Sequence, residues 1–146
     1  MIRRVAFVVL AITVGIAVDL IGSALGALFS LVGLGILDEL TGSSLSTVLT
    51  TPDSPLQAAF PLFFVGVATT LGAFVAARFA GLHTLAFGLL FATASLLVSA
   101  FFLEFSSPTG FNATAWQVIH ILLVILASLL GAFLESLYSH RRVVAS

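Results

Sequence analysis

The sequence contains no cysteine and no lysine, and only 8% of its 146 residues are charged. Without cysteine, the chain forms no disulfide, no thiolate nucleophile, no cysteine-ligated metal site and no iron–sulfur cluster. Its five cations are all arginines and lie at three distant places in the sequence, at 3–4, 78 and 141–142, so they offer no extended basic groove of the kind that binds a nucleic-acid backbone. We therefore expect no nucleic-acid partner.

The scarcity of charge also limits the solvent that the chain can face. An ordinary soluble domain carries about a quarter charged residues, because water must hydrate its surface. Here 60% of the residues are hydrophobic and the mean hydropathy is +1.26. The composition therefore predicts an integral membrane protein whose first partner is the lipid bilayer.

Four apolar segments occupy approximately residues 5–30, 57–80, 84–104 and 115–138. Each is near or above the roughly 20 residues that a helix needs to cross a bilayer core. Backbone hydrogen bonds must be made internally at that depth, and the leucine, alanine, phenylalanine and valine content favours helices over barrel strands. The sequence predicts one all-α domain over residues 1–146, an integral membrane four-helix bundle.

Polar and turn-forming residues separate the apolar segments. The first connection contains Thr-Pro-Asp-Ser-Pro at 51–55, and the third contains Ser-Ser-Pro-Thr-Gly at 106–110. The middle connection, around residues 81–83, is very short. We therefore expect the second and third helices to form a tight antiparallel hairpin.

The arginines predict the orientation of the spans. Arg3 and Arg4 precede the first segment, Arg78 closes the second, and Arg141 and Arg142 follow the fourth. An even number of spans places all of them on one side of the membrane, and the side that is rich in arginine is the cytoplasmic one. We expect a multi-pass protein of the bacterial inner membrane, with both termini in the cytoplasm and the first and third connections outside.

A secretory signal peptide is an alternative interpretation of the N-terminal segment. Arg3 and Arg4 precede an apolar run, and Ala24-Leu25-Gly26 resembles a small-residue cleavage site. The apolar core of a signal peptide is about 7–15 residues, whereas this run continues well beyond that length. A transmembrane helix is therefore the interpretation that we retain.

Small residues recur at three- and four-residue spacing within three of the segments. In lipid there is no hydrophobic drive between helices, and small residues mark the places where two backbones approach closely. Gly22-x-x-x-Gly26 is such a motif in the first segment. The residues that we expect at helix contacts are Gly15, Gly22, Gly26, Gly72, Ala76 and Gly131.

One acid lies within the first apolar segment. At 1.5 Å per residue, Asp19 is roughly 20 Å from the cytoplasmic edge, slightly outward of the midplane. An ionised and unpaired carboxylate there is unfavourable by several kcal/mol, so Asp19 must be protonated, hydrogen-bonded or exposed to water. Polar residues of the other segments lie within a turn or two of this depth: Ser95, Ser99, His120, and Thr69 or Thr70. A proton-titratable site and a buried structural hydrogen bond both remain open.

Arg78 and Glu135 have matched depths near the cytoplasmic ends of the second and fourth segments. We expect an ion pair between them at the cytoplasmic edge. The alternative is that Arg78 extends to the lipid headgroups without a partner, as arginines at helix ends do.

The histidines do not predict a cofactor. His83 belongs near the inner surface and His120 nearer the outer one, so the two cannot flank one haem iron. His120 and Glu104 could reach a metal at the outer face, but they have no motif spacing. We expect no cofactor and no metal.

Part of the chain resembles known membrane proteins. The stretch Leu71–Gly81, with Trp116 and the stretch Leu130–Leu134, resembles a pattern in small four-helix membrane proteins of bacteria. This resemblance covers about half the chain and implies a helical bundle without indicating an activity. Asp19 is also similar to the essential acid in the first helix of small multidrug resistance transporters. That acid is a glutamate, and the loop at 38–57 is longer than in those transporters.

Three functions remain possible. The first is a structural or accessory subunit, which associates with itself or with a larger membrane complex through its small-residue stripes. The second is a proton-coupled small-molecule transporter or channel that uses Asp19. The third, a membrane-embedded enzyme, is disfavoured because the sequence has no catalytic constellation.

Overall fold

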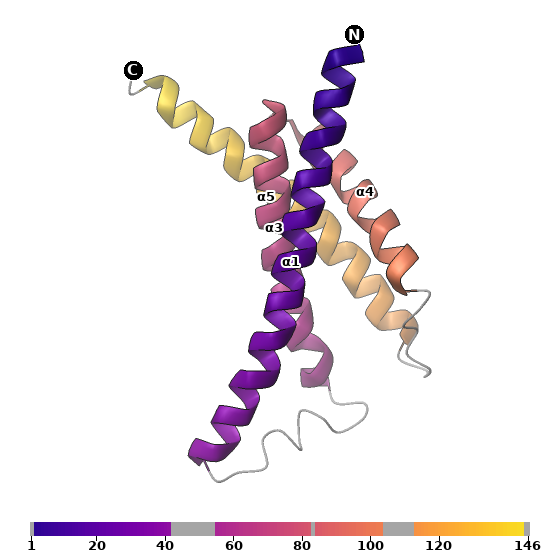
Figure 1. The fold of residues 1–146 in the computed structure, drawn as a ribbon, viewed down its shortest axis with the longest axis vertical. Coiled ribbons are helices and arrows are strands. Elements are labelled where there is room, and N and C mark those ends of the chain that lie inside the picture. Colours follow the sequence, from indigo (N-terminus) through magenta and orange to yellow (C-terminus); the bar gives the residue numbers. More distant parts are fainter. Residues whose placement is uncertain (1, 42–54, 83, 104–112, 145–146) are drawn as a thin grey trace.

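The computed structural model describes residues 2–41, 55–82, 84–103 and 113–144. Within these ranges the chain is helical except for Gly81, Leu82 and Thr84, which belong to the connection between two helices. It forms α1 (Ile2–Thr41), α3 (Pro55–Ala80), α4 (Leu85–Leu103) and α5 (Ala113–Val144), and the described residues form no strand (Figure 1). This confirms the predicted all-α, four-helix fold.

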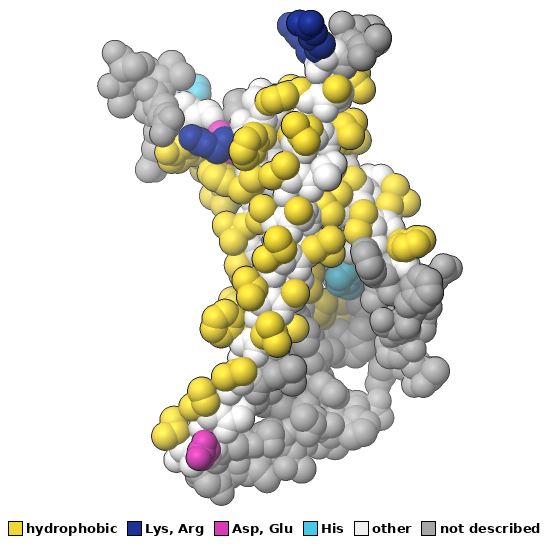
Figure 2. Space-filling view, in the orientation of Figure 1, with side chains coloured by type: hydrophobic (Ala, Val, Ile, Leu, Met, Phe, Trp, Pro, Cys, Tyr) yellow, Lys and Arg dark blue, Asp and Glu magenta, His cyan; other side chains and the backbone are white. Residues whose placement is uncertain are grey.

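Three of the helices are long and apolar enough to cross a membrane. The spans are Arg3–Phe29 in α1, Leu62–Ala80 in α3 and Gln117–His140 in α5. The apolar part of α4, Leu85–Phe101, is shorter, and at 1.5 Å per residue it is about 25 Å long against a hydrocarbon core of about 30 Å. Hydrophobic side chains cover most of the described surface in Figure 2, as a lipid-facing exterior requires.

The first helix is longer than the segment that we expected. α1 continues past residue 30 to Thr41, through a stretch in which Asp38 and Glu39 suggested a loop. Leucine and glutamate are good helix formers, and their propensity outweighs that of Gly33 and Gly35 in this part of the chain. A Cβ atom at either glycine would meet no atom within 4 Å, so the helix here is not shaped by packing against described residues.

A tight turn joins α3 to α4. Gly81 has a φ of 64°, and Leu82 donates its backbone N–H to the carbonyl of Ala77 at 3.2 Å, as in a Schellman cap. Thr84 then caps α4, because its Oγ1 accepts the N–H of Phe87 at 3.3 Å. The connection is as short as the sequence indicates. However, α4 packs mainly on α5 and only lightly on α3.

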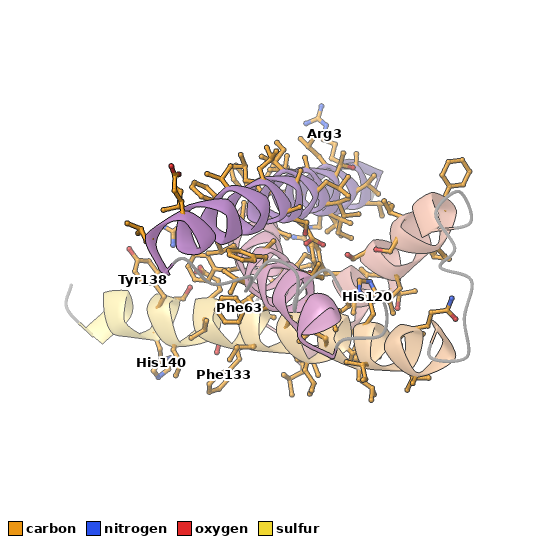
Figure 3. All side chains as sticks on the ribbon, turned by 90° about the horizontal axis from the view of Figure 1, so that it is seen from below. Arg3, Phe63, His120, Phe133, Tyr138 and His140 are labelled. Carbon is orange, nitrogen blue, oxygen red and sulfur yellow. The ribbon has the colours of Figure 1, made fainter. Side chains whose placement is uncertain are left out.

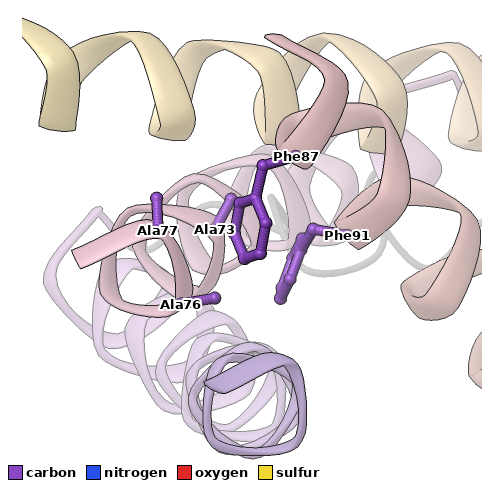
Figure 4. Packing of buried hydrophobic residues seen from close by; sticks show 5 residues of the cluster. All are labelled: Ala73, Ala76, Ala77, Phe87 and Phe91. Carbon is purple, nitrogen blue, oxygen red and sulfur yellow. The ribbon is translucent and has the colours of Figure 1, made fainter. Parts of the chain in front are cut away.

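α3 is the central helix of the bundle. It packs against α1 on one side and α5 on the other, and α1 and α5 make no direct packing contact among the described residues. Phe87 and Phe91 of α4 fill the space beside α3, against Ala73, Ala76 and Ala77 (Figure 4). The aromatic rings thus keep α4 away from α3, while small residues let α4 approach α5.

Glycines lie where α1 and α3 cross. A Cβ atom on Gly15 would be 2.6 Å from the carbonyl oxygen of Gly72 and 2.7 Å from Cβ of Ala76, so the two backbones are almost in contact. Two and three turns further along α1 from Gly15, Gly22 faces Ala68 and Gly26 faces Phe64. The small stripe of α1 is therefore used to pack on α3.

The contacts of α5 follow the same rule. A Cβ atom on Gly131 would collide with the carbonyl oxygen of Thr70 and lie 2.8 Å from Cβ of Ala73, so α5 crosses α3 at this glycine. On the neighbouring face, Gly88 of α4 approaches Ser128 and Ala132 of α5. Close backbone approach explains how helices with little polar surface hold together.

Candidate functional site: a polar cluster around Asp19

Asp19 lies on the small-residue stripe of α1 and is only 7% exposed. Thr69 of α3 donates its hydroxyl to Oδ1 at 2.9 Å, and Ser95 of α4 donates its hydroxyl to Oδ2 at 2.8 Å. Each carboxyl oxygen therefore has a donor from a different helix. Asp19 is thus a polar link between α1, α3 and α4.

The glycine crossing positions this link. Gly72 of α3 faces Asp19, and a Cβ atom on Gly72 would be 3.2 Å from Cβ of Asp19. A larger residue at 72 would hold α1 and α3 apart and lengthen the hydrogen bond from Thr69. Ser95 reaches the same carboxyl group because Phe91, one turn earlier on α4, packs where Gly15 and Gly72 meet.

The structure distinguishes between the two threonines that the sequence left open. Thr69 is fully buried and faces Asp19, whereas Thr70 donates its hydroxyl to the carbonyl of Gly66 in its own helix at 2.8 Å. Ser99, four residues beyond Ser95, is half-buried and is not a donor to Asp19 in the described part of the chain. Ser23, one turn along α1, also lies beside the carboxyl group.

His120 of α5 lies near this cluster. It is half-buried and close enough to Asp19 for their charges to interact. Its Nε2 atom is buried and has no hydrogen-bond partner within the described residues. Figure 3 shows His120 on the side of α5 that faces the other helices. Asp19, Ser95 and His120, which the sequence grouped by depth alone, thus lie in one region.

The chemistry of the cluster is that of a carboxyl group with two hydroxyl neighbours. A hydroxyl group can either donate or accept a hydrogen bond. If Asp19 is protonated, the oxygen of Thr69 or Ser95 can therefore accept a hydrogen bond from the carboxyl O–H. The cluster can therefore serve as a structural link or hold a proton. No group of three or more metal-ligating side chains occurs among the described residues. His83 and Glu104, considered above for haem and metal binding, lie outside the described residues.

A second polar group joins α3 and α5. Arg78 Nη1 is 3.6 Å from Glu135 Oε2, and the Glu135 side chain is 3% exposed against 40% for Arg78. Ser139 donates its hydroxyl to Glu135 Oε1 at 2.9 Å. The guanidinium group also lies 4.9 Å from the ring centroid of Tyr138, which in turn meets Phe74 edge-on.

The sequence did not lead us to expect Tyr138 and Ser139 beside this ion pair; Tyr138 is predicted only as an aromatic anchor at the membrane interface. Their spacing of three and four residues from Glu135 is the signal that could have found them, because such positions share a helix face. The alternative in which Arg78 has no protein partner does not describe this structure, since Glu135 and Tyr138 both contact it.

Comparison of the chain with protein families, curated proteins and solved structures found no match.

Proposed function

We propose that the protein is a multi-pass membrane protein that acts as a structural or accessory subunit, and that it associates with itself or with a larger membrane complex. A second small-residue stripe on α1 carries this proposal. Ala6, Thr13, Ala17 and Ala24 are all exposed, and they follow one another at intervals of seven, four and seven residues. These intervals place them on one helix face.

This outer stripe lies opposite the face of α1 that packs on α3. Ala17 is two residues from both Gly15 and Asp19, which corresponds to a rotation of about 200° around the helix. The Thr13 hydroxyl donates to the carbonyl of Val9 at 2.9 Å, so it presents a satisfied, compact surface. Because small residues mark close helix approach in lipid, we propose that the outer stripe receives a helix from outside the chain.

The polar cluster supports a structural role for the bundle itself. Both oxygens of Asp19 are occupied by hydroxyl groups of the same chain, and the side chain is almost completely buried. A carboxyl group in this environment fixes the relative positions of three helices. It leaves the outer face of α1 free to form an interface.

Crosslinking tests the proposed interface directly, because the chain has no cysteine of its own. If α1 pairs with a second copy, Ala17→Cys and Ala24→Cys should form disulfide-linked dimers in oxidised membranes. Leu25→Cys is the matched control, since Leu25 is adjacent in sequence and exposed but lies about 100° away on the helix. If the partner is another protein, Ala17→Phe should release it from the purified complex while Leu25→Phe should not.

A monomeric mass in detergent, with equal crosslinking at positions 24 and 25 and no co-purifying partner, would remove the basis of this proposal. Association that persists in Ala17→Phe would show that another face of the molecule is used.

A second candidate function is proton-coupled transport of a small molecule. His120 favours it, because its imidazole lies near the Asp19 carboxyl group and has a buried nitrogen for which the described residues supply no hydrogen-bond partner. Histidine and carboxyl groups that interact inside a membrane are typical of proton relays. In reconstituted vesicles, wild-type protein should then take up protons with substrate, and His120→Gln should abolish this uptake while leaving Ala17→Cys crosslinking intact.

The orientation of the chain is part of the proposal. We propose that all four helices span the bacterial inner membrane, with both termini in the cytoplasm. Figure 1 supports this orientation, because the N-terminus, the C-terminus and the end of α3 lie towards the same end of the bundle. Arg3, Arg4 and Arg78 belong to that end, and exposed Glu39 belongs to the other end of α1.

A further inference from the structure

A groove of about 850 Å³ lies beside the N-terminal half of α1. Side chains from three parts of the chain form its apolar walls: Val5, Val8 and Ile12 of α1, Ala80 and Leu82 at the end of α3, and Leu90 of α4. The groove exists because α1 packs closely on α3 but makes few contacts with α4. Arg3 and Arg4 line the same groove at the end that lies beside the N-terminus of α1.

The groove combines an apolar wall with a cationic end. None of the described residues that line it is acidic, so these residues do not neutralise the two guanidinium groups. Arginine binds phosphate oxygens with two parallel hydrogen bonds, which makes it better suited than a simple point charge to a phosphodiester. Basic pockets between helices at the membrane surface bind anionic lipid headgroups for these reasons.

We propose that this groove binds an anionic phospholipid, with an acyl chain along the apolar wall and the phosphate at Arg3 and Arg4. A free phosphate ion would use only the two exposed arginines and leave the apolar wall uncovered. A zwitterionic lipid would fill the wall equally well but would carry no net charge to match the arginines. The lipid site is independent of the outer stripe of α1, so either proposal can fail without the other.

Lipid binding can be measured on the detergent-purified chain by native mass spectrometry, with phosphatidylglycerol and phosphatidylcholine as the two probes. The wild type should retain phosphatidylglycerol in preference to phosphatidylcholine. Arg3→Gln with Arg4→Gln should weaken phosphatidylglycerol binding by about 25-fold, since each cation near a headgroup contributes about a 5-fold preference. Purified protein avoids any effect of these arginines on membrane insertion.

Arg141→Gln with Arg142→Gln is the matched control, because it removes the same charge from the other end of the sequence. This control should keep the wild-type lipid preference. Val5→Trp tests the apolar wall without a change in charge, and it should reduce the binding of phosphatidylglycerol while the helical circular dichroism stays unchanged. Inorganic phosphate should not displace the lipid.

Three outcomes would overturn the proposal. The first is equal retention of the two lipids by the wild type. The second is an equal loss of phosphatidylglycerol binding in the two double variants, at positions 3 and 4 and at positions 141 and 142, which would mean that only the net charge of the protein matters. The third is complete displacement by inorganic phosphate, which would reduce the site to a surface anion site.

Discussion

At the scale of single residues, Asp19 shows how a carboxyl group is accommodated inside an apolar helix. Its two oxygens accept hydrogen bonds from Thr69 and Ser95, and each donor is itself buried. A buried polar group that loses its partner destabilises a fold more than a partnered one stabilises it. The contribution of each hydroxyl can therefore be measured by its removal.

We expect Thr69→Val and Ser95→Ala each to lower the free energy of unfolding in detergent by about 1 kcal/mol, the usual size of an interhelical hydrogen bond in a membrane protein. Thr70→Val is the control and should have a smaller effect, because the Thr70 hydroxyl only bonds its own helix. Equal losses at positions 69 and 70 would show that the bond to Asp19 contributes nothing specific.

Asp19→Asn separates the two candidate functions. An amide can still accept a hydrogen bond from Thr69 and can donate one to the Ser95 oxygen, so the fold and the association through α1 should be retained. An amide cannot carry a proton, so any proton-coupled transport should be lost. Crosslinking of Asp19→Asn with Ala17→Cys, together with proton uptake in vesicles, distinguishes these outcomes; loss of crosslinking would link Asp19 to assembly instead.

At the scale of helices, the crossings depend on glycine where no side chain fits. Gly15→Ala would place a methyl group 2.7 Å from Ala76 Cβ and from the Phe91 ring. Backbone or side-chain atoms would have to move to relieve this collision, and such shifts lower the free energy of unfolding by about 1–3 kcal/mol. Gly33→Ala, in the same helix, meets no neighbour within 4 Å and should leave stability unchanged or slightly raised. Thermal unfolding in detergent compares the two directly, and a loss at position 33 that matches the loss at position 15 would contradict the packing argument.

The Arg78–Glu135 pair joins α3 to α5. Arg78→Gln leaves the Glu135 carboxyl buried without its cation. This substitution should therefore lower the free energy of unfolding by more than the loss of an ion pair between two exposed side chains does. Because Arg78 is partly exposed, we expect a coupling of only about 1 kcal/mol in a double-mutant cycle with Glu135→Gln. Strictly additive effects on unfolding in detergent would show that the two side chains act independently.

At the scale of the whole molecule, the orientation of four antiparallel spans is the main prediction. A cytoplasm-active reporter should work when fused after Ser146, and a periplasm-active reporter should work when inserted near Thr50, because the arginines gather at the opposite end. Reporter activity near Gly110 tests whether the shorter α4 crosses the membrane. A cytoplasmic signal there would leave α4 as a helix that does not span.

Local composition is enough to predict the class of this protein. Long apolar segments must become helices in lipid, because every backbone polar group needs an internal partner there, and this rule acts on local composition alone. The same local pattern placed Asp19 on a stripe of small residues and matched the depths of Arg78 and Glu135. Neither property depends on how the helices rotate against one another.

Which polar groups meet depends on how the helices pack in three dimensions. Adjacent positions such as Thr69 and Thr70 point about 100° apart on a helix, so the rotation of α3 against α1 selects Thr69 as the donor to Asp19. The packing of α4 on α5, despite its short connection to α3, depends on Gly88 and on the space filled by Phe87. These hydrogen-bond partners and helix contacts depend on interactions between helices that are distant in sequence, so no local sequence pattern predicts them.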